Sequence, residues 1–228
     1  MKKFFTLAIC AMAVLFASCE KNEPSLDKDN PSGGGENDHE YVDLGLSVKW
    51  ATCNVGASKP EEYGDYFAWG ETQPKSIYDW STYKWYNGDN GNLTKYCYDS
   101  LSGIVDNKTV LDLSDDAARA NWGGSWRMPT DAEFTELFGN CAWKWTTQNG
   151  VDGYKLTSTK NGKSIFLPAA GIRGDSSLYH AGSYGYYWSS SLGTDYPGSA
   201  WRVGFHSNYV LRDGSNRIDG FSVRPVCP

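Results

Sequence analysis

The sequence is poor in the residue types that hold metal ions. Its 228 residues include three histidines and six cysteines, and no two cysteines form a Cys-x-x-Cys pair. The histidines, His39, His180 and His206, are far apart, so the ligand spacing of a zinc site is missing. Segment 87–92 is rich in Asn, Asp and Gly but lacks the spacing and final glutamate of an EF-hand, which favours a solvated turn over a calcium site. We therefore expect no metal and no cofactor.

Basic residues are also scarce. The chain has 21 Lys and Arg against 27 Asp and Glu, a formal net charge of −6. Residues 20–40 hold seven acidic and two basic side chains, and Lys2 and Lys3 are the only other charges before residue 41, which leaves −3 for residues 41–228. A domain without a basic field has no electrostatic attraction for phosphate backbones. We expect no nucleic-acid partner.

Long apolar runs are absent after the N-terminus. The single long run, 4–16, follows two lysines and is too short to span a bilayer comfortably as a helix. It leads into Leu-Phe-Ala-Ser-Cys at 15–19, which resembles the lipobox of bacterial lipoproteins, with Phe16 where that pattern prefers Leu. The alternative is a plain secretory signal that leaves Cys19 as a free thiol. Because a polar segment starts directly after Cys19, we expect a lipoprotein signal peptide at 1–18 and a lipid anchor on Cys19.

Residues 19–40 have the composition of a flexible acidic tether. Segment 30–37 is Asn-Pro-Ser-Gly-Gly-Gly-Glu-Asn, which offers no apolar side chain to bury. An acidic segment directly after a lipidated cysteine is similar to lipoproteins of the Bacteroidetes, in which it can direct export to the outer face; Lys21 interrupts it here. The expected location is the outer membrane, with the protein held by Cys19 and exposed at the cell surface.

Residues 41–228 have the length of a single domain. Aromatic residues make up 15% of the chain, with ten Trp and fifteen Tyr, so a core can form despite few aliphatic residues. Four of the six cysteines lie in this domain, and in an exported protein they allow three disulfide connectivities or free thiols, between which the sequence does not choose. These cysteines are Cys53, Cys97, Cys141 and Cys227.

Local patterns predict two hairpins and a buried strand. One hairpin lies at 41–50 with Gly45 at its turn, and the other lies at 154–167 with an Asn-Gly turn. An aromatic run predicts a buried strand at 63–70. Residues 74–110 carry no regular pattern, so we expect an irregular segment there.

Two short helices are predicted between the hairpins. Ser114 is placed to cap the first, at 115–120, with acidic residues in its first turn. Thr130 and Glu133 form the capping box of the second, which carries an apolar stripe and ends at Gly139. The second signature is the stronger because both capping partners are present.

The C-terminal tract alternates short apolar segments with polar ones. Strands are predicted at 185–191, 200–205 and 220–226, separated by loops at 192–199 and 206–219. We expect the loops and strand ends to form a binding face, because Tyr, Trp and Arg dominate binding hot spots. The alternative for Trp201 is packing in the core. The candidate residues are Tyr196, Trp201, Arg202, His206, Asn208, Tyr209, Arg212, Asp213 and Asn216.

Four motifs, taken in order, carry a family resemblance. Segments 45–57, 63–72, 126–130 and 166–171 resemble the Fibrobacter succinogenes major paralogous domain, a family of exported proteins common in gut Bacteroidetes. The resemblance extends over the domain from residue 41 to residue 226. The family is largely without assigned function, so the resemblance implies export rather than an activity.

A more distant resemblance concerns the fold. Segments 115–117, 127–134 and 220–224 are similar to the sulfatase-modifying, formylglycine-generating family, which has a C-type-lectin-like fold. The variable proteins of diversity-generating retroelements share that fold and vary in their C-terminal tract. The resemblance implies an α+β domain with two short helices, a small twisted, mostly antiparallel sheet and long loops.

The motifs of three chemistries that this fold suggests are incomplete. Formylglycine-generating enzymes bind copper with a cysteine pair late in the chain, whereas Cys227 stands alone here and Cys141 is far upstream. The Gly-Ser-Tyr-Gly segment at 182–185 lacks the spacing of a nucleophile elbow. Calcium-dependent lectins use Glu-Pro-Asn or Gln-Pro-Asp, whereas residues 73–75 are Gln-Pro-Lys. We therefore do not expect an enzyme.

The sequence thus predicts a surface lipoprotein that binds a protein or glycan ligand through its C-terminal loops, and a diversified receptor is one form of such a module. Two alternatives remain open: a structural envelope or fimbria-associated subunit, and an enzyme of the formylglycine-generating type. An exposed sheet edge would favour the first alternative, and two cysteine sulfurs beside a cleft would favour the second.

Overall fold

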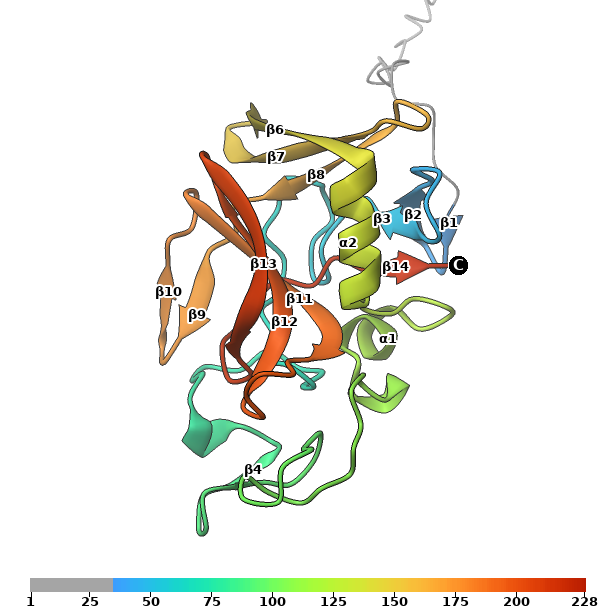
Figure 1. The fold of residues 1–228 in the computed structure, drawn as a ribbon. Coiled ribbons are helices and arrows are strands. Elements are labelled where there is room, and N and C mark those ends of the chain that lie inside the picture. The colour runs from blue at the N-terminus through green and yellow to red at the C-terminus, as the bar shows by residue number, and fades with distance from the viewer. Residues whose placement is uncertain (1–34) are drawn as a thin grey trace, which may run out of the picture. The chain divides into compact units, whose positions relative to one another are not determined.

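The structure, a computed structural model, describes residues 35–228 (Figure 1). The predicted signal peptide at 1–18, the predicted anchor Cys19 and residues 20–34 of the predicted tether lie outside the described residues. The fold is mostly β, with two short helices and several small antiparallel sheets. Among the described residues, no helix is long and apolar enough to cross a membrane.

One sheet joins the two ends of the described chain. Its strands pair antiparallel in the order β1-β2-β3-β14, with Val226 of β14 opposite Trp50 of β3. The predicted hairpin at 41–50 is confirmed, and Gly45 in its loop has a φ of 71°. The strands are β1 (Gly35–Glu36), β2 (His39–Val42), β3 (Lys49–Ala51) and β14 (Val226–Cys227).

The ordered domain begins earlier than the sequence predicted. Residues 35–40, assigned above to the tether, form β1 and the start of β2. Polar contacts hold this ribbon: the Glu36 carboxylate accepts a hydrogen bond from the Ser125 amide at 2.6 Å. The His39 ring stacks on Trp122 with 3.8 Å between ring centroids. The composition of residues 35–40 did not predict these strands, because the residues that hold them lie about ninety positions downstream.

A three-stranded meander packs against the longer helix. β6 (Cys141–Gln148) pairs with β7 (Val151–Ser158), and β7 pairs with β8 (Ser164–Pro168). The β7–β8 pair confirms the predicted hairpin at 154–167, whereas β6 was not predicted. The helix α2 (Asp131–Asn140) contacts β6 and also β11 and β12 of the C-terminal sheet, and Figure 1 shows it beside that sheet and below β6.

The C-terminal sheet has three antiparallel strands in the order β11-β12-β13. They are β11 (Tyr184–Leu192), β12 (Ser199–His206) and β13 (Tyr209–Asn216). The first two match the predicted strands at 185–191 and 200–205. The prediction of a loop at 206–219 is wrong, because eight of its residues pair with β12 as the edge strand β13.

Two predicted strands are buried but irregular. Segment 220–226 is not a strand over its length, because its bridges go to different partners: Phe221 pairs with Phe67, and Ser222 with Tyr187. Segment 63–70 likewise makes an isolated bridge through Phe67 instead of a ladder. Both segments cross the core between sheets, so their aromatic and apolar side chains are buried without a continuous partner strand.

Both helices are present, with one cap moved. α1 (Ala117–Trp122) is capped by Asp116, whose side chain accepts a hydrogen bond from the Arg119 amide at 3.0 Å. The predicted cap, Ser114, lies instead in the short 3-10 helix η2 (Leu113–Asp115). The capping box of Thr130 and Glu133 on α2 is confirmed, and that helix ends one residue beyond Gly139.

Three short elements complete the described chain. The hairpin of β4 (Tyr86–Asn87) and β5 (Asn92–Leu93) contains the predicted turn at 87–92. A second hairpin joins β9 (Ile172–Gly174) and β10 (Ser177–Tyr179). The 3-10 helix η1 (Trp80–Thr82) and the β4–β5 hairpin lie in the long segment 74–110, which is irregular elsewhere as predicted.

Buried arginines tie the irregular segments to the sheets. Arg224 is fully buried and donates to Asn54 Oδ1 at 2.9 Å and to three backbone carbonyls, including that of Phe166 at 2.9 Å. Arg217 is also fully buried and donates to the Tyr83 hydroxyl at 2.9 Å and to three carbonyls. A buried guanidinium is stable only when its donors are satisfied, so both arginines have a structural role.

Candidate ligand-binding face

The sheet β11-β12-β13 packs one face on the core, and its other face is only partly open, because Trp188 on that side is fully buried against Phe221. On the core side, Tyr187, Val203 and Phe205 are buried in one hydrophobic cluster. Side chains alternate along a strand, so their neighbours in sequence lie on the other side. We call that other side the outer face and define it by Tyr184, Tyr186, Arg202, His206, Tyr209 and Asp213.

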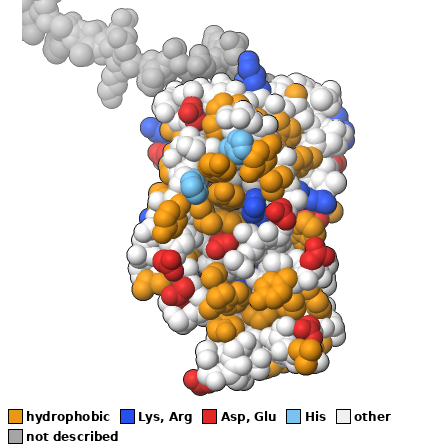
Figure 2. Space-filling model, turned by 60° about the vertical axis from the view of Figure 1, so that its left-hand side comes forward, with side chains coloured by type: hydrophobic (Ala, Val, Ile, Leu, Met, Phe, Trp, Pro, Cys, Tyr) orange, Lys and Arg blue, Asp and Glu red, His pale blue; other side chains and the backbone are white. Residues whose placement is uncertain are grey.

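Aromatic rings form a connected row on the outer face. His206 lies between Tyr184 on β11 and Tyr209 on β13, with ring centroids 5.1 Å and 3.9 Å away. Tyr184 is stacked parallel to Tyr186 at 6.1 Å, and His180 extends the row at 5.1 Å from Tyr184. Figure 2, which brings the side of β9 and β10 forward, shows two histidine side chains among hydrophobic ones.

Arg202 lies at the other end of this face with unused hydrogen-bond donors. Its guanidinium lies over the Tyr186 ring at 4.9 Å, and its nearest carboxylate oxygen, on Asp213, is 3.9 Å away. The side chain is only 14% exposed, and its Nε is buried without a hydrogen-bond partner among the described residues. Burial lowers the pKa of Arg202, and the nearby Asp213 opposes that effect. Buried polar groups are normally paired, so this guanidinium calls for an explanation.

A second carboxylate, Asp219, lies close to Arg202. Burial raises the pKa of Asp219 to about 6, while a hydrogen bond from Ser215 and the charge of Arg202 act to lower it. The Ser215 hydroxyl donates to Asp219 Oδ2 at 2.9 Å. Asp213 differs, because its side chain is 63% exposed. The outer face therefore offers one cation, two carboxylates and a row of rings.

The structure brings together four of the nine predicted site residues. Arg202, His206, Tyr209 and Asp213 lie on the outer face; Arg202 is on a strand as predicted, and the other three are on strands rather than on the predicted loop. Asn208 lies in the turn beside them, where its amide donates to His206 Nδ1 at 3.2 Å.

The other predicted residues lie elsewhere. Arg212 is on the core side of β13, where it stacks over Trp201 at 5.3 Å and pairs with Asp131 of α2 at 3.2 Å. Trp201 is half-buried on that side, so it is neither fully packed in the core nor part of the outer face. Asn216 ends β13 opposite Ser199.

Tyr196 lies in a separate hollow. It is 56% exposed and, with residues of the β4–β5 hairpin, lines a cavity of about 230 Å³. Leu101, which also lines this hollow, is 90% exposed. Residue type does not separate Tyr196 from the other candidates, because its surroundings depend on where the loop between β11 and β12 lies relative to the β4–β5 hairpin.

Three residues at or near the outer face were not predicted as site residues. Tyr184 and Tyr186 belong to the row of rings on β11, and Asp219 lies after β13, where it interacts with the charge of Arg202. The alternation in β11 carried a signal for the two tyrosines, since they lie on the side opposite the buried Tyr187. Asp219 had no local signal, because its burial depends on β12.

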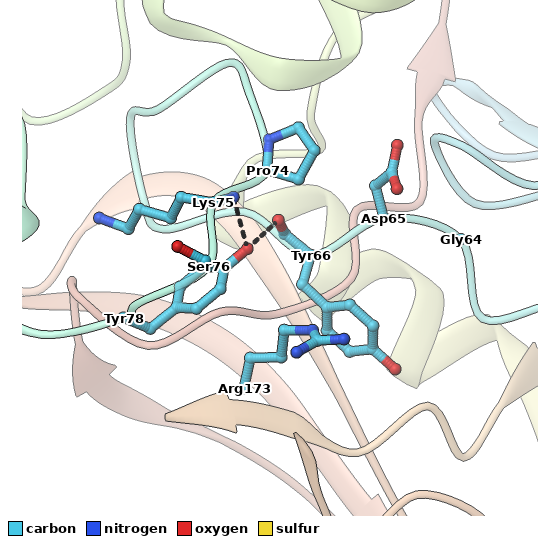
Figure 3. Close-up of a pocket in the computed structure, with 8 residues that line it drawn as sticks. All are labelled: Gly64, Asp65, Tyr66, Pro74, Lys75, Ser76, Tyr78 and Arg173. Carbon is cyan, nitrogen blue, oxygen red and sulfur yellow. Dashed lines mark hydrogen bonds between the residues drawn. The ribbon is translucent and has the colours of Figure 1, made fainter. Parts of the chain in front are cut away.

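A broad hollow of about 510 Å³ is lined by residues of the segment 64–78 and by Arg173 of β9 (Figure 3). Part of its wall is held by internal hydrogen bonds: the Tyr78 hydroxyl donates to the Tyr66 carbonyl at 2.6 Å and accepts from the Lys75 amide at 3.3 Å. Lys75 Nζ pairs with Glu71 at 3.0 Å, and Arg173 lies over the Tyr66 ring at 5.4 Å. These contacts stabilise the segment 64–78.

The cysteines do not form a reactive pair. Cys53, Cys97, Cys141 and Cys227 are free, and the last three lie in three different core clusters. Burial raises the pKa of Cys141 to about 11 and also raises the pKa of Cys53 and Cys227. Thiols with raised pKa values are poor nucleophiles and poor metal ligands. In residues 35–228, no group of three His, Cys, Asp or Glu side chains is arranged to hold a metal ion.

Comparison of the chain with curated proteins and with solved structures finds no match. A family model described as Domain of unknown function (DUF8237) matches residues 143–226, which extend from β6 to the start of β14 and include the whole outer face.

Proposed function

We propose that this protein is a non-enzymatic binding module, anchored at the cell surface by a lipid on Cys19, whose ligand binds the outer face of β11-β12-β13. The observation that carries the proposal is the mostly buried side chain of Arg202, whose guanidinium has no hydrogen-bond acceptor among the described residues and lies over the half-buried ring of Tyr186. Aromatic side chains next to a partly desolvated Arg are the usual composition of binding hot spots. The fold that we propose is C-type-lectin-like, supported by the two helices, the small antiparallel sheets and the long irregular segment 74–110.

Binding of the full-length protein, in detergent, to arrayed glycans and to immobilised surface-protein extracts tests the site. Tyr209→Ala removes a 43% exposed ring from the outer face, whereas Arg212→Ala changes the same strand on its core side. We expect at least one probe to retain the wild type and the Arg212→Ala control, and to lose about tenfold in affinity with Tyr209→Ala, the equivalent of about 1.4 kcal/mol. Equal binding of all three proteins to every retained probe would contradict the proposal.

The anchor is tested separately. Metabolic labelling of cells with a palmitate analogue should label the wild-type protein and not Cys19→Ala, because lipidation requires that thiol. Full labelling of Cys19→Ala would exclude this anchor while leaving the binding face untouched.

A structural envelope subunit is the second candidate function. β13 is an edge strand, and such strands can accept a strand from another chain. Arg212 and Asp213 are exposed on this edge, and charged side chains discourage strand addition. A ligand-binding role is therefore the better supported of the two.

A further inference from the structure

The unused donors of Arg202 require an acceptor that the described residues do not supply. The guanidinium has five N–H donors, yet its closest carboxylate oxygen, on Asp213, is 3.9 Å away, beyond hydrogen-bond distance. Its Nε is buried without a partner, and the side chain opens to the outer face through the 14% that is exposed. Arg224 and Arg217, the fully buried arginines of the same domain, have their donors satisfied. Arg202 differs from them in facing outward.

The charges around Arg202 decide what kind of acceptor fits. Asp213 and Asp219 both lie close enough to act on the charge of Arg202. An anionic ligand would meet these two carboxylates, and a cationic ligand would meet the guanidinium itself. A neutral, oxygen-rich ligand can accept from Arg202 and donate to the exposed carboxylate of Asp213 at the same time.

The rings beside Arg202 decide the shape of the ligand. Tyr186 lies under the guanidinium, and Tyr184 is stacked parallel to Tyr186 with an interplanar angle of 5°. His206 and the 43% exposed Tyr209 continue the row. A pyranose ring has a flat C–H face that packs on aromatic rings and a rim of hydroxyls that both donate and accept. Aromatic rings and an Arg–Asp pair next to one another on the same face of the sheet offer partners for both surfaces.

We propose that the outer face binds a neutral sugar unit of a glycan without a metal ion. Arg202 donates to one hydroxyl, Asp213 accepts from the neighbouring hydroxyl, and the sugar ring packs on Tyr184 and Tyr209. This rests on the proposed function and deepens it by naming the ligand class. The site is separate from any calcium chemistry, because Asp213 and Asp219 are the carboxylates close to Arg202 and no described group of three His, Cys, Asp or Glu can hold a metal ion.

The test uses full-length protein in detergent with excess EDTA. The probes are polyacrylamide conjugates of galactose, glucose, mannose, fucose and N-acetylglucosamine, with glucuronic acid and N-acetylneuraminic acid conjugates as the charged comparison. We expect at least one neutral conjugate to bind, the free sugar to compete, and Arg202→Gln and Asp213→Asn each to weaken binding about tenfold, as loss of a charge-assisted hydrogen bond does. Arg173→Gln, whose guanidinium lies on Tyr66 outside the outer face, is the matched control and should bind as the wild type does.

Several results would overturn the inference. They are binding of acidic conjugates only, binding that EDTA abolishes, neutral binding that neither variant weakens, and no binding of any conjugate. If Arg202→Gln fails to fold, Asp213→Asn decides, because that side chain is 63% exposed. Binding of an arrayed protein that Tyr209→Ala weakens, with no sugar bound, would refute the sugar and leave the proposed function standing.

Discussion

The guanidinium of Arg202 occupies the space that a side chain at Gly204 would fill. The two residues point to the same side of β12, and a Cβ on Gly204 would collide with Nη1 of Arg202 and lie 3.4 Å from Cδ1 of Tyr186. A glycine inside a strand often marks such a close approach. Gly204 therefore lets the guanidinium lie flat against the sheet beside Tyr186.

Gly204→Ala should displace Arg202 without unfolding the protein. The clash is with the far end of a flexible side chain, so the backbone has no need to move. We expect the melting temperature to stay within a few degrees, since the substitution changes stability by about 1 kcal/mol or less, while binding to the conjugate retained by the wild type falls. Gly214→Ala is the matched control, because its Cβ would meet Ser199 at 3.4 Å instead of Arg202. Equal binding of both alanine variants would show that the position of Arg202 is irrelevant.

Thr130→Ala tests a structural residue of α2. The Thr130 hydroxyl accepts from the Glu133 amide at 3.2 Å, and the Glu133 carboxylate accepts from the Thr130 amide at 2.8 Å. Losing such an N-cap costs about 1 kcal/mol, which urea unfolding would measure, and ligand binding should not change. Thr135→Ala on the exposed side of the same helix removes no cap and should be close to neutral. A binding defect in Thr130→Ala at unchanged stability would contradict the structural role.

The contrast between α2 and β13 explains which parts of the fold the sequence predicted. The cap of α2 is local, since Thr130 and Glu133 are three residues apart, so the sequence contains both partners. β13 contains Asp213, Gly214 and Asn216, which are typical of loops, and becomes a strand only through its pairing with β12. Local patterns therefore predicted α2 and the hairpin at 154–167 with its Asn-Gly turn, and missed an edge strand that depends on its neighbour.

The same limit applies to the candidate site. Arg202, His206 and Tyr209 could be chosen by residue type and by their place in the C-terminal tract. Their separation from Arg212 required the register of β12 with β13, which puts Val203 opposite Arg212 and so turns Arg212 toward the core side. The burial of Arg224 could not be predicted from the sequence, because the backbone carbonyls that accept its hydrogen bonds are distant in the chain.

Arg224→Lys should be strongly destabilising. The guanidinium of Arg224 satisfies Asn54 and three carbonyls in a fully buried position, and an ammonium with three donors cannot reproduce that geometry. Leaving buried acceptors unpaired costs about 1–3 kcal/mol each, so we expect a loss of at least about 3 kcal/mol in chemical unfolding. Arg173→Lys, at a half-buried guanidinium that lies over Tyr66, is the control and should cost far less. Similar losses for the two would mean that the hydrogen bonds of Arg224 contribute little.

The stability of the protein should depend on pH through Asp219. Burial raises the pKa of this carboxyl from 3.8 to about 6, against the opposing effects of Ser215 and Arg202. A carboxyl whose pKa is higher in the folded state favours folding below its unfolded pKa, and this contribution is lost as pH rises through about 6. Each pKa unit corresponds to about 1.4 kcal/mol, so the ionised form costs about 2–3 kcal/mol above that range.

Asp219→Asn removes this titration while keeping an oxygen that can accept from Ser215. The free energy of unfolding of the variant minus that of the wild type should therefore increase from about pH 4 to about pH 6 and stay constant above, because only the wild type loses stability over that interval. Urea unfolding of both proteins across that interval measures the difference. Asp213→Asn is the control: it neutralises the mostly exposed carboxylate near Arg202, so its unfolding free energy shows how stability changes when a negative charge near Arg202 is removed without a buried carboxyl. A difference that falls with pH would mean that the attraction of the Arg202 charge outweighs the burial of Asp219, and would reverse the assignment of Asp219 as a destabilised carboxylate.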